Sequence, residues 1–138
     1  MMSIEIPREI LEQIIEQARA EALIEACGIL AGKGKRVEQL YKMTNVDNSC
    51  DHFMMEPREQ FSIVKEMRSA GLTMLGIYHS HPASPARPSE EDIRLALTPG
   101  VAYVIVSLKS SQPTAKAFVI EDGKAAEIAL SIVETNNV

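Results

Sequence analysis

Aromatic residues and cysteines are scarce in this sequence, and long apolar runs are missing. Aromatic side chains make up 4% of the 138 residues and tryptophan does not occur, so the core must be built from aliphatic and methionine side chains. The two cysteines, Cys27 and Cys50, provide neither a CxxC motif nor enough thiols for a disulfide framework. No apolar stretch approaches the roughly 20 residues that a membrane-spanning helix requires.

Positive charge is also limited. The chain has 14 lysines and arginines against 19 acidic residues, which gives a formal net charge of −5. Nucleic acids and anionic membranes both select for basic surfaces, so we expect neither as a partner. The N-terminal segment is acidic and amphipathic, without the basic start and apolar centre of a secretory signal. We therefore expect the protein in the cytoplasm.

The length and the apolar periodicity predict one α/β domain. A chain of 138 residues lies within the usual size of a single domain. Periodicity and Pro/Gly breaks predict helices over 7–24, 57–70 and 89–97, strands over 27–32, 37–43, 73–81, 101–108 and 114–120, and a weakly extended tail over 123–134. Helices that alternate with strands in this way indicate an α/β sandwich with one mixed sheet.

Residues 79–92, HSHPASPARPSEED, concentrate the chemically versatile side chains. His79 and His81 lie two apart on the predicted strand and therefore project from the same face. Ser89 and Asp92 lie three apart at the start of a predicted helix and share its first turn. Two imidazoles and one carboxylate are a common ligand set for catalytic zinc. The same set also suits a non-haem iron site, so the spacing leaves both metals open.

A hydrolytic metal site needs a general base and a donor for the oxyanion. Ser89 is the candidate donor, and Glu25, where the first helix meets the apolar run at Cys27, is the candidate base. A structural reading competes with this one. Ser89-Glu-Glu-Asp92 also fits a helix-capping pattern, the two histidines could be partly exposed side chains, and Glu25 alone could be a solvated carboxylate at a helix end.

The spacing of these residues resembles the HxHx(7)SxxD signature of the JAMM (MPN+) metallopeptidases at every defined position. The segment EACGILAG (25–32) is similar to the E-x-C-G-L-L-x-G segment of that family, whose glutamate falls on Glu25. The segment NVDNSCDHFMMEP (45–57) resembles the asparagine-containing loop of the bacterial branch.

This resemblance implies a mechanism and a fold. His79, His81 and Asp92 would bind one catalytic Zn²⁺, Ser89 would stabilise the oxyanion, and Glu25 would be the general acid/base. The fold would be a cytidine-deaminase-like α/β/α sandwich with a central mixed β-sheet, in a single domain over 1–138 with its core at about 4–121. The substrate would be a peptide or isopeptide bond at the C-terminal tail of a ubiquitin-like or sulfur-carrier protein.

Several alternatives stay open at this point. About eight residues separate Asp92 from the strand at Val101, which leaves no room for a ubiquitin-gripping insertion, so we do not expect cleavage of ubiquitin chains. A non-catalytic MPN-type scaffold and a relative of the RadC proteins are the competing identities, and a homodimer through the apolar first helix is open. Met54, Met55 and Tyr78 would line the substrate groove or belong to the core.

Overall fold

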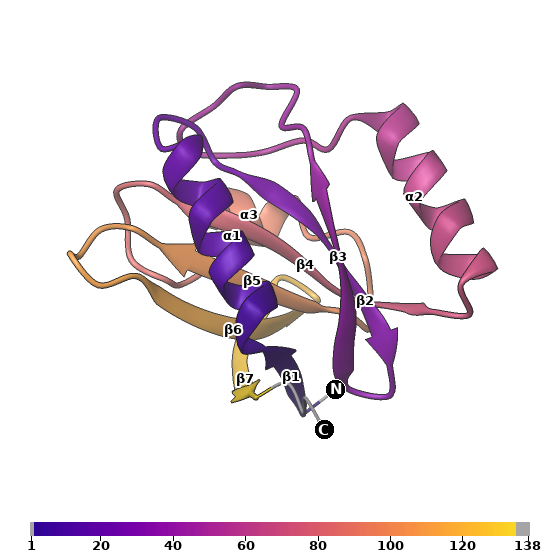
Figure 1. Cartoon of the computed structure of the whole chain (residues 1–138). Helices are drawn as coiled ribbons and strands as arrows, with labels where there is room; N and C mark the ends of the chain where they lie inside the picture. Colours follow the sequence, from indigo (N-terminus) through magenta and orange to yellow (C-terminus); the bar gives the residue numbers. More distant parts are fainter. Residues whose placement is uncertain (1, 135–138) are drawn as a thin grey trace.

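One mixed sheet with helices on both faces forms the protein in the computed structural model, which describes residues 2–134 (Figure 1). The described elements, in chain order, are β1 (Ser3–Pro7), α1 (Arg8–Ala20), β2 (Cys27–Lys33), β3 (Arg36–Met43), α2 (Pro57–Ser69), β4 (Thr73–His81), α3 (Glu90–Arg94), β5 (Ala102–Ser107), β6 (Thr114–Glu121) and β7 (Lys124–Val133). Residue 1 and residues 135–138 of the predicted domain lie outside the described part. No helix within 2–134 has both the length and the apolar content needed to cross a bilayer.

The strands follow the order β1-β3-β2-β4-β5-β6-β7 and close on themselves through β1. β1 is parallel to both β3 and β7, β4 is parallel to β5, and the remaining pairs are antiparallel. The predicted mixed-sheet α/β domain is therefore confirmed. The cytidine-deaminase-like α/β/α sandwich is not confirmed, because the strand order describes a closed sheet.

Two apolar clusters lie on opposite faces of the sheet. Ile10 and Ile14 of α1 pack in a cluster with Val104 of β5, whereas Met67 of α2 belongs to a cluster with Tyr103 of the same strand. Neighbouring residues of a strand point to opposite faces, so α1 and α2 cover different sides of β5. Figure 1 shows the two helices on separate sides of the ribbon.

Several predicted boundaries need correction. Strand β1 was not predicted, and the helix predicted over 7–24 ends at Ala20. The helix predicted over 89–97 spans only Glu90–Arg94, and the weakly extended tail contains the regular strand β7. β1 and β7 pair with each other, five residues against five. The paired residues are more than 120 positions apart in the sequence, so local sequence patterns do not reveal the pairing.

Gly28 of β2 is required by the tyrosine that lies across from it on β4. Tyr78 pairs with Gly28, is fully buried, and donates a hydrogen bond of 2.6 Å to Gln17 Oε1 of α1. A Cβ on residue 28 would lie 2.2 Å from the Tyr78 hydroxyl oxygen. We expect Gly28→Ala to lower the free energy of unfolding by about 1–3 kcal/mol, as overpacking does. Urea denaturation measures this, and an unchanged midpoint would contradict the required close approach.

Candidate metal centre

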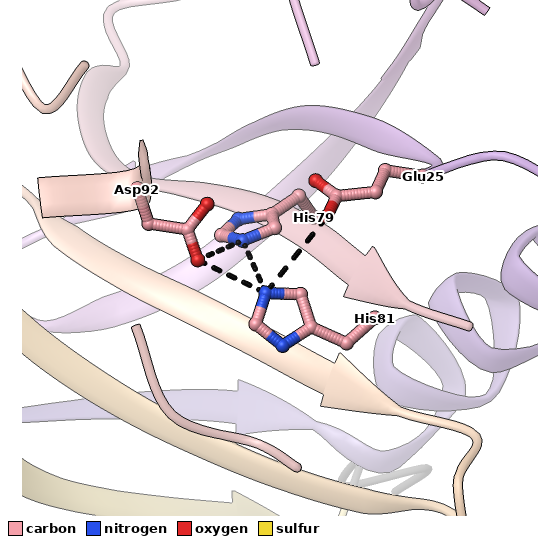
Figure 2. Close-up of side chains that lie close together, drawn as sticks. All are labelled: Glu25, His79, His81 and Asp92. Carbon is pink, nitrogen blue, oxygen red and sulfur yellow. Dashed lines mark hydrogen bonds and ion pairs between the residues drawn. The ribbon is translucent and has the colours of Figure 1, made fainter. Parts of the chain in front are cut away.

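The end of β4 and the start of α3 bring the predicted ligands together. His79 and His81 lie on one face at the end of β4, and the chain then turns through the proline-rich segment 82–88 to Ser89. Asp92 follows in the first turn of α3 and points back at both imidazoles (Figure 2). The proline-rich segment breaks the strand as predicted and is tied down by a hydrogen bond of 2.6 Å from Ser107 Oγ to Ser84 O.

Three ligand atoms converge in the buried centre. His79 Nε2 lies 3.1 Å from His81 Nε2 and 3.1 Å from Asp92 Oδ2, and His81 Nε2 lies 2.9 Å from Asp92 Oδ2. The three side chains are at most 4% exposed. Ligands about 2.0–2.1 Å from a tetrahedral ion are separated from one another by roughly 3.3 Å. The size and chemistry of the triangle therefore fit one small cation.

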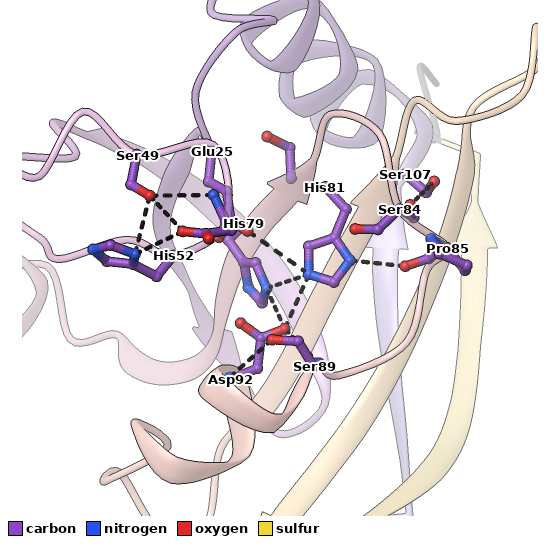
Figure 3. Close-up of polar contacts among 12 residues, drawn as sticks. Glu25, Ser49, His52, His79, His81, Ser84, Pro85, Ser89, Asp92 and Ser107 are labelled. Atoms are coloured by element: carbon purple, nitrogen blue, oxygen red, sulfur yellow. Dashed lines mark hydrogen bonds and ion pairs between the residues drawn. The ribbon is translucent and has the colours of Figure 1, made fainter.

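The orientation of His81 is set by its second ring nitrogen. Its Nδ1–H donates a hydrogen bond of 2.7 Å to Pro85 O, which places the lone pair of Nε2 toward the ligand triangle (Figure 3). The ring of His79 stacks on Phe53 with the ring centroids 4.8 Å apart. Its Nδ1 is buried with no hydrogen-bond partner among the described residues. Both imidazoles are thus fixed by neighbours outside the triangle.

The capping interpretation of Ser89 and Asp92 is correct and is compatible with a metal site. The Asp92 backbone N–H donates to Ser89 Oγ at 3.0 Å, and the Ser89 backbone N–H donates to Asp92 Oδ2 at 2.9 Å. The oxygen that faces the imidazoles is therefore also held by the helix start. A hydroxyl that accepts one hydrogen bond keeps its own proton, so the Ser89 hydroxyl can still donate a hydrogen bond beside the cluster.

Glu25 completes the cluster from a distant part of the chain. Its carboxylate is 2% exposed, and its Oε2 lies 4.0 Å from His81 Nε2. Its Oε1 is buried without a hydrogen-bond partner in the described part of the chain. The four side chains Glu25, His79, His81 and Asp92 offer ligand atoms that all lie within 4.8 Å of one another. The interpretation of Glu25 as a solvated carboxylate is therefore wrong.

Burial and charge shift the pKa values of the cluster in different directions. Burial, reinforced by the negative charge of Asp92, raises the pKa of Glu25 from 4.5 to about 8. Burial lowers the pKa of His79, which favours the neutral imidazole that a metal requires. Burial opposes ionisation of Asp92, but hydrogen bonds with His79 and His81 outweigh it and hold the Asp92 pKa well below its usual range.

A cavity of about 370 Å³ opens beside the cluster, with His79 and Asp92 in its wall. Its other lining is mostly apolar and comes from the loop before α2, the start of α2, the segment after α3, and the sheet: Asp47, His52, Phe53, Met54, Met55, Pro57, Gln60, Ile77, Leu95, Leu97, Thr98 and Tyr103. Met54, Met55 and Tyr78 were each predicted either to line the groove or to belong to the core. Met54 and Met55 line the cavity, and Met55 also belongs to a core cluster, whereas Tyr78 lies in the core beneath α1. Phe53, Leu95 and Leu97 were not predicted, because apolar residues carry no signal that separates a groove from a core.

Comparison with known proteins identifies the family. Residues 7–121 match the model of the prokaryotic homologs of the JAB domain. The CysO-cysteine peptidase of Mycobacterium tuberculosis is 33% identical over 94% of this chain and 90% of its own length. The desampylase of Pyrococcus furiosus is 31% identical over 92% of this chain and 89% of its own length.

Solved structures agree with this assignment. A protein from Desulfitobacterium hafniense has a TM-score of 0.88 and 42% identity, with 97% of this chain and 95% of that chain covered. A JAMM structure with a metalloprotease-like zinc site shares the fold, with a TM-score of 0.58 and 23% identity over 92% of this chain and 96% of that chain. The fold, the relatives and the buried cluster define a hydrolase of the JAMM type. The chain belongs to the family of prokaryotic homologs of the JAB domain.

Proposed function

We propose that this protein is a zinc-dependent peptidase that hydrolyses a peptide or isopeptide bond at the C-terminal tail of a ubiquitin-like or sulfur-carrier protein. The observation that carries the proposal is the convergence of three ligand atoms within 3.1 Å of one another, with a buried carboxylate beside them. The names of the relatives, a CysO-cysteine peptidase and a desampylase, support a substrate of this class.

His79, His81 and Asp92 are the residues that would hold the metal ion. The donor set suits zinc and also iron, and a zinc ion in such a site supplies polarisation of a water molecule for nucleophilic attack near neutral pH. Glu25 would take the proton from the attacking water and deliver it to the leaving amine. A carboxyl group whose pKa is raised to about 8 can hold a proton between these two steps.

The decisive experiment uses a β-grasp carrier protein with a short C-terminal extension as substrate. Mass spectrometry should show removal of the extension by zinc-loaded protein, no removal after chelation, and recovery when zinc is added back. Loading the same protein with Fe(II) under anaerobic conditions distinguishes the two metals. If zinc-loaded wild type and Glu25→Gln behave alike on a panel of such substrates, the proposal is wrong.

Ser89 is the proposed donor to the oxyanion. Removal of one such donor typically lowers kcat by about 10²–10³. We therefore expect Ser89→Ala to lose activity by this factor, together with about 1 kcal/mol of stability from the lost helix cap. Ser89→Thr keeps both the hydroxyl and the cap and is the matched control. A loss of stability in Ser89→Ala without a change in kcat would reduce Ser89 to a capping residue.

A further inference from the structure

The backbone of Glu25 and Ala26 is held at every polar atom, although these residues precede the first residue of β2. The Glu25 N–H donates to Ser49 O at 2.8 Å, and Glu25 O accepts from Asn45 Nδ2 at 3.0 Å. The Ala26 N–H donates to Ser80 Oγ at 2.8 Å, and Ala26 O accepts from the Ser80 N–H at 2.9 Å. Figure 3 shows the contact between Ser49 and the Glu25 backbone. Two buried side chains, Ser80 and Asn45, therefore fix this short segment.

Ser80 links the segment to the strand that carries the ligands. It lies between His79 and His81 on β4 and is 1% exposed. Alternation along the strand turns its side chain away from the two imidazoles, so its hydroxyl reaches Ala26 while they face the cluster. Ser80 thereby ties Ala26, the residue next to Glu25, to the strand that carries both histidines.

Asn45 links the same segment to the wall of the cavity. Its amide nitrogen donates to Glu25 O and to His52 O, and its Oδ1 accepts from the backbone N–H groups of Asp47 and Met54, at 3.0–3.1 Å. These four bonds use both donors and both lone pairs of the carboxamide. Asp47, His52 and Met54 all line the cavity beside the cluster. Asn45 therefore connects Glu25 to the loop that a bound tail would touch.

The carboxylate of Glu25 lacks comparable restraints of its own. Oε1 has no hydrogen-bond partner within the described chain, and Oε2 has its contact with His81 at 4.0 Å. The position of the carboxylate is consequently set by its backbone. We propose that Ser80 and Asn45 are positioning residues that clamp the Glu25 backbone, so that its carboxylate reaches the water and the leaving amine. This inference rests on the proposed function, in which Glu25 moves the proton.

A double-mutant cycle with Glu25→Gln tests the clamp, because a residue that acts through Glu25 has no effect once the carboxylate is gone. We expect Ser80→Ala to lower kcat by about 10- to 100-fold in the wild-type background, the size of effect that a small misplacement of a reacting group produces. KM and the affinity for zinc should stay within about threefold, since the ligands are untouched. In the Glu25→Gln background, Ser80→Ala should cause no further loss.

Two more variants sharpen the result. Ser80→Thr retains an acceptor for the Ala26 N–H and should restore most of kcat. Asn45→Asp retains the acceptor for the loop amides but replaces the donor to Glu25 O, and should show the same non-additivity with Glu25→Gln. Hydrogen exchange in metal-free protein provides a readout independent of activity, since the Ala26 amide should exchange faster in Ser80→Ala. If Ser80→Ala does not fold, the Asn45→Asp cycle decides.

An equal loss of kcat from Ser80→Ala in the wild-type and Glu25→Gln backgrounds would overturn the proposal that Ser80 acts through Glu25. So would a Ser80→Ala variant whose kcat and Ala26 exchange rate are both unchanged. Failure of the proposed function looks different. In that case wild-type protein loaded with zinc cleaves no carrier substrate, or Glu25→Gln cleaves it as fast as wild type. The two failures are therefore distinguishable in one set of measurements.

Discussion

Glu25→Gln is expected to lower kcat by about 10²–10⁴, the usual contribution of a general acid/base, while zinc binding persists. The amide has nearly the same shape as the carboxyl group but cannot accept the proton of the attacking water. Single-turnover cleavage followed by mass spectrometry measures the rate, and zinc titration by competition with a chromophoric chelator measures the affinity. A variant that loses zinc together with activity would assign Glu25 to the ligand set instead.

The same substitution should stabilise the metal-free protein at alkaline pH. Glu25 keeps its proton up to about pH 8 in the folded protein, whereas its ordinary pKa is 4.5. The unfolded chain binds fewer protons between these values, so wild-type stability falls as the pH rises across this window. A pKa difference of this size lowers the free energy of unfolding of the wild type by at most about 4–5 kcal/mol, and the whole loss is present above pH 8. Glutamine carries no such penalty.

Urea unfolding of chelated wild type and Glu25→Gln at pH 4, 7 and 9 checks this expectation. The contribution of Glu25 ionisation to the difference in free energy of unfolding should be small at pH 4. It should grow at pH 7 and again at pH 9, in favour of the variant. Identical pH dependence of the two proteins would show that the Glu25 carboxyl is not buried in the metal-free state.

Asp92→Asn is expected to abolish hydrolysis and to remove the stabilisation that zinc provides. A neutral amide oxygen is a poor replacement for a carboxylate ligand, and a ligand that binds only the folded state at 1,000 times its Kd stabilises it by about 4 kcal/mol. Zinc should therefore raise the Tm of wild type but not of Asp92→Asn, and chelation should reverse the rise. Glu90→Gln, which alters an exposed carboxylate on the same helix, is the matched control.

Two results would contradict this assignment. A zinc-dependent rise in the Tm of Asp92→Asn equal to that of wild type would place the metal elsewhere. Activity that survives prolonged chelation in wild type would remove the metal from the reaction. Acidification should also weaken zinc binding, because protons compete with the metal for the imidazoles.

Local spacing predicted which side chains share a face, and the family resemblance added that they bind one metal ion. An i, i+2 pair on a strand and an i, i+3 pair at a helix start each fix two side chains on one side, and the structure brings His79, His81 and Asp92 together as this spacing predicts. The proline-rich segment 82–88 between the two pairs makes the single turn that brings the start of the helix against the end of the strand. Glu25 was different, because no spacing signal ties it to the two histidines. Its place where the first helix meets the apolar run at Cys27 made it the candidate base, and the family resemblance then supported that assignment.

The rest of the site depends on long-range packing that local patterns do not encode. Asn45 lies in a polar segment that was predicted as a loop. Three of its hydrogen bonds stay within that loop, at Asp47, His52 and Met54, but the bond that bears on the site reaches Glu25 O, on the other side of β2 and β3 in the sequence. Leu95 and Leu97 belong to a segment predicted as helix that leaves the helix after Arg94 and lines the cavity. The side chains that position the chemistry were thus harder to predict than those that perform it.

Strand β1 has a consequence for handling the protein. Its five residues pair with β7 along their whole length and contact β3 at Glu5, while Ile4 and Ile6 are fully buried. A chain that began at Arg8 would leave two strands with unpaired backbone N–H and C=O groups, which are templates for intermolecular strand pairing. Trimming the N-terminus would therefore favour aggregation before it altered a single catalytic side chain.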